Sequence, residues 1–177
     1  MYKRVLVPLD GSPVAEAILP FIKEIAGSLD VEIVLLRVVS LTPEEAIGVA
    51  PKFALDTPAA LEQAAQRYLE ARVEDLRARA IRASARVAVG EAASEIVAAA
   101  RQIGADLIAM TTHGRSGLGR LLFGSVAESV LRTAPTPVFL LKMTEEALKA
   151  IGSLGAERVR RVLRKLGGDA DHLLGCQ

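Results

Sequence analysis

The chemistry that this sequence can perform is concentrated in one glycine-rich stretch, TTHGRSGLGRLLFGSV, at residues 111–126. The stretch follows a short apolar run at residues 105–110, and a helical pattern begins near its end, at about Ser125. A helix N-terminus offers unpaired N–H donors and the positive end of its dipole, and glycines let a backbone approach an anion closely. The order of strand, basic glycine loop and helix therefore predicts a phosphate-binding site.

Individual side chains within this stretch have specific predicted roles. Ser125 directly follows Gly124, and its hydroxyl is suited to cap the helix and also to donate a hydrogen bond to a phosphate. Arg115 and Arg120 are interleaved with the glycines and can neutralise phosphate charge. The alternative is a flexible surface loop whose arginines are merely solvated. His113 has no nearby carboxylate to orient it as a base, so we interpret it as a loop residue.

Two common phosphate-binding motifs do not describe the stretch. No lysine follows a glycine here, as the P-loop motif requires, and Leu122 stands where G-x-G-x-x-G has its last glycine. The stretch resembles instead the universal stress protein family. Nucleotide-binding members of that family carry a glycine, two residues, a second glycine, nine residues, and then a glycine followed by Ser or Thr.

The resemblance can be followed residue by residue. Gly114 and the pair Gly124-Ser125 fit the last two parts of the pattern, whereas Thr111 stands in place of its first glycine. The resemblance runs from about Tyr2 to Lys142, and it includes the segment VLVPLDGS near the front and PTPVFLLK near the end.

Membership of this family implies a fold, a ligand and a set of contacts. It implies a parallel sheet with strand order 3-2-1-4-5, a homodimer, and a bound adenine nucleotide, with ATP and Mg²⁺ as the first choice. Val38 is implied to line the adenine pocket. The nucleotide contacts that we carry over or expect are Pro8, Leu9, Asp10, Val38, Met110, Thr111, Gly114, Arg115, Gly124, Ser125 and Val126.

Asp10 has two interpretations. As a ligand residue, it accepts hydrogen bonds from ribose hydroxyls or holds a magnesium ion carried by the phosphates. As a structural residue, it is a turn aspartate that bonds its own backbone before Gly11. The local sequence favours the structural interpretation, and the family resemblance favours the ligand interpretation.

The wider pattern of the chain predicts the scaffold that positions these residues. Short apolar segments alternate with helical patterns, and strands joined by helix-length crossovers lie parallel in a doubly wound three-layer sandwich. Ligands of such sheets bind beyond the carboxyl ends of the strands, where the strand order reverses. The five predicted strands span residues 5–9, 31–39, 85–89, 105–110 and 138–142.

Local signals predict the helix boundaries. Ser12 and Pro13 have the residue types of an N-cap and a first helical position. Pro20 is expected to kink the first helix, and Gly104 has the position of a helix C-cap.

Composition excludes several classes of function. The 177 residues carry a formal net charge of +1 and only 3% aromatic residues, so neither a basic surface nor stacking platforms for nucleic acid are expected. Two histidines and one cysteine do not make a metal-ligand cluster. The lone Cys176 suits a reducing compartment, and no apolar run is long enough to span a membrane. We therefore expect a cytoplasmic protein without stable membrane insertion.

Two further segments predict interactions. The apolar strand Val138–Leu141 is an edge strand that invites pairing with a second copy of the chain. Residues 1–143 form the predicted domain, and residues 144–177 form a C-terminal helical extension. The apolar stripe of that extension, flanked by arginines, suggests a partner protein or a membrane surface. The alternative is a helix docked on its own domain or on its dimer partner.

These observations favour a regulatory nucleotide-binding protein over an enzyme. No positioned general base or catalytic lysine is visible, so hydrolysis of ATP is expected to be slow at most. One alternative is an interaction protein of the same fold that binds no nucleotide, for which Thr111 is the supporting residue. A second alternative is an enzyme that uses adenylate or phosphoryl chemistry, for which the stretch offers only His113.

Overall fold

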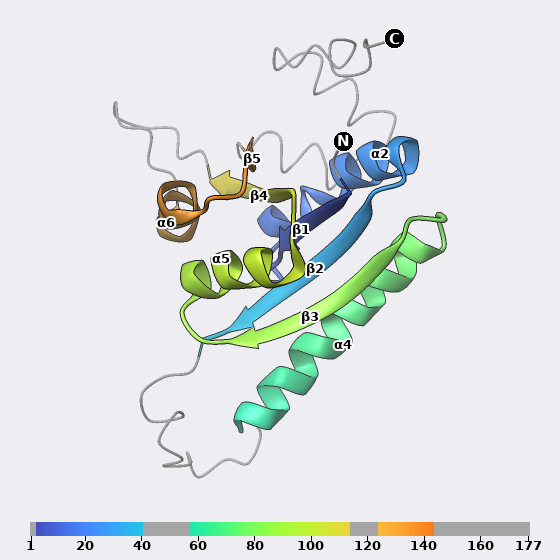
Figure 1. Ribbon diagram of the computed structural model, residues 1–177. Coiled ribbons are helices and arrows are strands. Elements are labelled where there is room, and N and C mark those ends of the chain that lie inside the picture. Colours follow the sequence, from blue (N-terminus) through green and yellow to red (C-terminus); the bar gives the residue numbers. More distant parts are fainter. Residues whose placement is uncertain (1–2, 41–56, 114–123, 144–177) are drawn as a thin grey trace.

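The computed structural model describes residues 3–40, 57–113 and 124–143. These residues form a five-stranded parallel sheet in the order β3-β2-β1-β4-β5 (Figure 1). Its strands are β1 (Arg4–Pro8), β2 (Glu32–Val39), β3 (Ala83–Val89), β4 (Leu107–His113) and β5 (Val138–Met143). The predicted fold class and strand order are confirmed. The predicted C-terminal extension lies outside the described residues.

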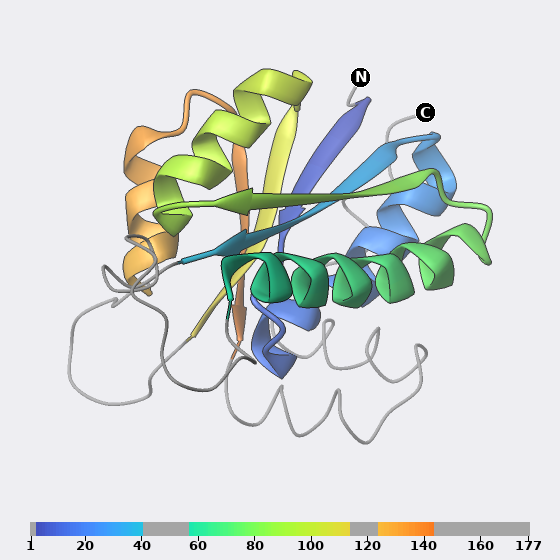
Figure 2. The same cartoon turned by 90° about the horizontal axis from the view of Figure 1, so that it is seen from below.

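Helices cover both faces of the sheet and give the molecule three layers (Figure 2). On one face lie α1 (Pro13–Glu16), α2 (Leu19–Leu29) and α4 (Pro58–Arg77). On the other face lie α5 (Ala92–Ile103) and α6 (Ser125–Thr133). Among these helices none is long and apolar enough to cross a membrane.

The central strand β1 is buried on both faces, as expected for a parallel sheet between two helical layers. Val7 belongs to the core cluster that includes Leu69 of α4, whereas its neighbour Leu6 belongs to the cluster that includes Ile96 of α5. Both β1 side chains are fully buried. The period-two alternation of strand side chains thus links the two cores through one strand.

The predicted helix signals are mostly confirmed. The Ser12 hydroxyl accepts a hydrogen bond from the backbone N–H of Ala15 at 3.1 Å, and Pro13 is the first residue of α1. Gly104 ends α5 with a left-handed φ of 61°. The predicted kink at Pro20 is wrong. The chain instead makes two helices, and Pro20 lies in the first turn of α2, where no intrahelical N–H bond is needed.

Strand β4 is longer than predicted. It continues beyond Met110 through Thr111 and Thr112 to His113. The reason is its partner β5, which pairs with it from Ile108 opposite Val138 to His113 opposite Met143. The start of the glycine-rich stretch is therefore strand rather than loop, and the β-branched threonines suit that conformation.

Asp106 joins the N-terminal ends of β1 and β4. Its carboxylate accepts hydrogen bonds from the backbone N–H groups of Lys3 at 2.7 Å and Arg4 at 2.9 Å. These two bonds hold the pKa of the Asp106 carboxyl below its ordinary value. The backbone N–H of Asp106 in turn donates to the Arg4 carbonyl at 2.9 Å.

This carboxylate predicts an acid-dependent loss of stability. Because its pKa is lowered by folding, its contribution is present above the unfolded pKa of about 3.9 and is lost as pH falls through the folded pKa. Asp106→Asn should therefore lower the free energy of unfolding at neutral pH, and its difference from wild type should shrink in acid. Urea unfolding measured across pH checks this. A difference that stays constant down to a pH of about 2 would contradict it.

Candidate functional site

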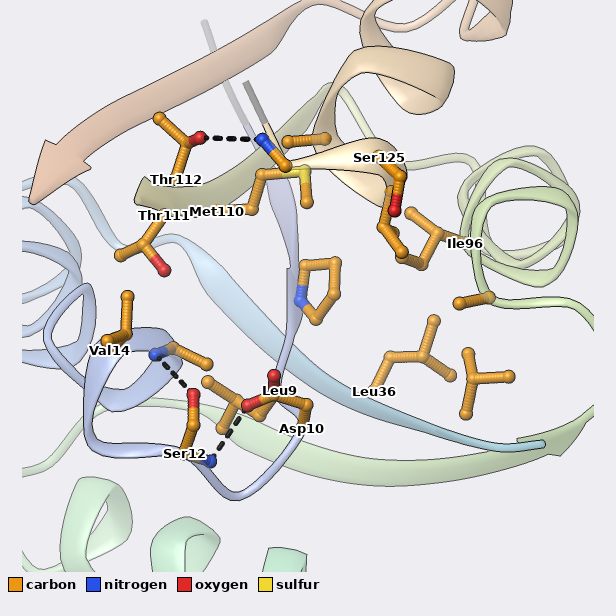
Figure 3. A pocket seen from close by; sticks show the side chains of 17 residues that line it. Leu9, Asp10, Ser12, Val14, Leu36, Ile96, Met110, Thr111, Thr112 and Ser125 are labelled. Atoms are coloured by element: carbon orange, nitrogen blue, oxygen red, sulfur yellow. Dashed lines mark hydrogen bonds between the residues drawn. The ribbon is translucent and has the colours of Figure 1, made fainter. Parts of the chain in front are cut away.

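A cavity of about 250 Å³ opens at the carboxyl edge of the sheet. It lies where β1 has β2 on one side and β4 on the other, which is the point at which the strand order reverses. Figure 3 shows the side chains that line it. The position expected for a ligand in a doubly wound sheet is thus hollow.

All of the predicted site residues that the structure describes line this cavity. They are Pro8, Leu9, Asp10, Val38, Met110, Thr111, Gly124, Ser125 and Val126. The other two, Gly114 and Arg115, lie outside the described residues. The residues that sequence reasoning missed are Ser12, Val14, Ala15, Leu36, Ala92, Ile96, Thr112 and Ala127.

The cavity has an apolar wall and a polar wall. Leu36 of β2 and Ile96 of α5 lie on one side, and Thr111 and Ser12 lie across the cavity from them (Figure 3). Leu36 and Ile96 belong to the core of the sheet. The apolar wall is therefore rigid, packed protein interior, which is the kind of surface against which a flat apolar ligand group binds.

Asp10 takes the structural role that its local sequence favours. Its Oδ1 accepts a hydrogen bond from the backbone N–H of Ser12 at 2.8 Å, which closes the turn around Gly11. The carboxylate also lines the cavity. A carboxylate has a second oxygen, so Asp10 can hold its turn and still accept a hydrogen bond from a ligand.

Asp10 is the only charged residue among the described residues of the cavity lining. Within the described ranges no three His, Cys, Asp or Glu side chains come close enough together to hold a metal ion. A magnesium ion near Asp10 would therefore take its other ligands from phosphates and water, which is how this ion is usually bound. The described lining also contains no pair of groups for acid–base catalysis.

The start of α6 differs from the prediction. Ser125 was expected to cap this helix, but the N-cap is Gly124, and Ser125 is already the first helical residue. No side chain caps this end, so the Ser125 hydroxyl is not consumed by a cap bond. The first backbone N–H groups of a helix have no partner within it. Among the described residues no acceptor is seen for the N–H groups of the first turn of α6, so this end presents backbone donors and the Ser125 hydroxyl to the cavity.

Thr112 attaches this helix start to the sheet. The side chain is only 4% exposed, and its Oγ1 accepts a hydrogen bond from the backbone N–H of Gly124 at 3.3 Å. The neighbouring Thr111 lies across the cavity from Ile96 and near Val14 of α1 (Figure 3). Because strand side chains alternate, the two threonines face opposite sides of the sheet. Thr112, rather than Thr111, is the threonine that contacts the helix N-terminus.

An open α/β sandwich with a lined cavity at its switch point is a scaffold for binding small ligands. The model of the universal stress protein family matches residues 1–142. The chain belongs to the universal stress protein family.

Individual relatives agree with this assignment. The chain is 32% identical over 142 residues to universal stress protein MJ0531 of Methanocaldococcus jannaschii, covering 80% of this chain and 83% of that protein. The solved structure of the hypothetical protein MJ0577 superposes with a TM-score of 0.66 at 31% identity, covering 81% of this chain and 97% of the other. A universal stress protein in complex with cAMP superposes with a TM-score of 0.58 at 25% identity, covering 80% and 97%.

The bond from Gly124 to Thr112 predicts a measurable loss of stability. Thr112→Val keeps the side-chain shape but leaves the Gly124 N–H without its acceptor. We expect the free energy of unfolding to fall by about 1 kcal/mol, the size of one buried hydrogen bond. Urea unfolding measures it, and Thr112→Ser, which retains the hydroxyl, is the control. Equal stability of Thr112→Val and wild type would show that the bond contributes nothing.

Proposed function

We propose that this protein binds an adenine nucleotide in the cavity at the carboxyl edge of the sheet, with Mg²⁺-ATP as the first choice. The observation that carries the proposal is the meeting of two distant segments. The end of β1 and the turn after it, with Pro8 and Asp10, line one cavity together with the start of α6, with Gly124 and Ser125. A cAMP complex is known for one related structure.

The two walls of the cavity suggest how the nucleotide lies. The adenine base packs against the apolar wall at Leu36 and Val38. The ribose hydroxyls donate to the free oxygen of Asp10. The phosphates lie at the N-terminus of α6, where Ser125 and the first backbone N–H groups donate to them. A volume of about 250 Å³ is small for a whole ligand site, so part of the nucleotide extends beyond the cavity that the described residues line.

The proposed role of the nucleotide is regulatory. Slow hydrolysis is the most that the described lining supports, because it offers Asp10 as its only ionisable group. We propose that the protein acts in the cytoplasm in a stress response. The alternative, an interaction protein without nucleotide, rests on Thr111 in place of the family's first motif glycine, and the following experiment decides between them.

Mg²⁺-ATP should stabilise the protein against thermal unfolding. A ligand at a hundred times its Kd adds about 2.7 kcal/mol to the free energy of unfolding, which differential scanning fluorimetry resolves. Gly124→Val should abolish the shift, because its side chain would occupy the approach of the phosphates to the backbone. No atom of the described residues lies within 4 Å of a Cβ placed at Gly124, so we expect the variant itself to fold normally.

A matched pair of serines on α6 tests the hydroxyl contact. Ser125→Ala should weaken ATP binding by about 1 kcal/mol, which is close to a fivefold rise in Kd. Ser129, one helical turn further along, does not line the cavity, so Ser129→Ala should leave Kd unchanged. If no adenine nucleotide shifts the wild-type melting temperature, the nucleotide proposal fails. Recovery of a shift by Thr111→Gly would then identify Thr111 as the obstacle.

We further propose that the chain forms a homodimer through β5. This strand is at the edge of the sheet, and Val138, Phe139, Leu140 and Leu141 are each only partly buried. An apolar edge strand with unpaired backbone groups favours pairing with another chain. Light scattering should give the mass of two chains at micromolar concentration. The mass of one chain would refute the proposal.

A further inference from the structure

Four side chains outside the cavity form one connected cluster behind the turn between β1 and α1. Glu16 of α1 accepts hydrogen bonds through Oε1 from the Tyr68 hydroxyl at 2.8 Å and from Arg72 Nη2 at 2.8 Å. The guanidinium carbons of Arg37 and Arg72 lie 4.9 Å and 5.1 Å from the centre of the Tyr68 ring. The cluster therefore joins β2, α1 and α4 through hydrogen bonds and cation–π contacts.

Two members of the cluster, Tyr68 and Arg72, have raised pKa values. Burial, together with the hydrogen bond to Glu16, raises the pKa of the Tyr68 hydroxyl well above its ordinary value. The hydrogen bond to Glu16 likewise raises the pKa of Arg72. Tyr68 thus remains a hydrogen-bond donor and Arg72 remains a cation at any physiological pH. The ring that supports Arg37 is held in one place by these bonds.

Arg37 lies between the Tyr68 ring and the turn that lines the cavity. Gly11 has a left-handed φ of +83°, and a Cβ placed on it would lie 2.7 Å from Arg37 Nη1. The guanidinium therefore occupies the space beside the Gly11 backbone that any other residue's side chain would need. Gly11 separates Asp10 from Ser12, and both of these neighbours line the cavity. Arg37 itself does not.

Arg37 differs from the other partly buried arginines. Arg4, Arg72 and Arg86 each donate a hydrogen bond to a side-chain acceptor. The Arg37 guanidinium lies instead over the Tyr68 ring and beside the Gly11 backbone. Among the described residues, the planar guanidinium of Arg37 therefore supports its neighbours by filling the space between them rather than by forming an ion pair.

We infer that Arg37 is a positioning residue for the ligand site. Arg37 stacks on the Tyr68 ring and thereby holds the Asp10–Gly11–Ser12 turn in the conformation that gives the cavity its polar wall. The geometry of the site is then set partly by α4, a helix from which no residue lines the cavity.

The test is amide hydrogen exchange in the ligand-free protein, followed by NMR. The reporter is the Ser12 N–H, which bonds to Asp10 Oδ1 across the turn. The internal reference is the Leu9 N–H, which bonds to the Leu36 carbonyl at 2.8 Å and reports opening of the strand itself. In Arg37→Met, exchange at Ser12 should accelerate by about fivefold, the factor for losing one contact of roughly 1 kcal/mol, while Leu9 is unchanged.

Two further variants make the result specific. Tyr68→Phe keeps the ring under Arg37 but removes the bond to Glu16, so it should accelerate Ser12 exchange in the same direction and less. It also serves as the test if Arg37→Met does not fold. Arg86→Met removes a partly buried strand arginine that bonds Gln102, and it should leave Ser12 exchange unchanged. Unchanged Ser12 exchange in both Arg37→Met and Tyr68→Phe would overturn the inference.

A second readout rests on the proposed function. In Arg37→Met the Kd for Mg²⁺-ATP, measured by calorimetry at a temperature where the variant is fully folded, should rise by about five- to tenfold. Arg86→Met should bind as wild type does. An unchanged Kd in Arg37→Met would count against the positioning role. If wild type binds no ATP, the proposed function fails, and the exchange measurement still decides the role of Arg37.

Discussion

The parallel pairing of β1 with β4 is the constraint on which the rest of the structure depends. The two strands are neighbours at Val5 opposite Leu107 and Leu6 opposite Ile108. The helices that follow β1 lie on one face of the sheet, and α6, which follows β4, lies on the other face (Figure 2). Because the helices that follow these two neighbouring strands cover opposite faces, a crevice is expected at the carboxyl edge between them, and the cavity lies there.

The site combines a packed wall with exposed backbone donors. Leu36 and Ile96 of its apolar wall belong to the core that covers one face of the sheet, so the packing that stabilises the fold also holds this wall in place. Besides the two threonines of β4, its polar groups lie at two element ends, the turn after β1 and the start of α6, where backbone groups are not all used by regular structure. A hydrogen bond to Asp10 fixes the turn after β1, and a hydrogen bond to Thr112 fixes the start of α6. The universal stress protein fold thus presents polar groups at a cavity without burying them unpaired.

Much of this arrangement could be predicted from sequence because its signals are local. The apolar segments predicted the five strands, Ser12 and Pro13 predicted the start of α1, and Gly104 predicted the end of α5. The residues carried over from the family motif all line the cavity where the structure describes them. Each of these features depends on the conformation of a few consecutive residues, which side-chain type restricts directly.

What the sequence by itself determined is therefore the set of elements, the fold family and the segments that meet at the site. Only the tertiary structure decided how they meet. Thr111 and Thr112 belong to β4 and pair with β5, and Gly124, whose N–H donates to Thr112, takes the cap position instead of Ser125. Leu36 and Ile96 reach the cavity only because β2 and α5 pack beside it. These outcomes depend on contacts between residues far apart in the chain, and no local pattern encodes such a partner.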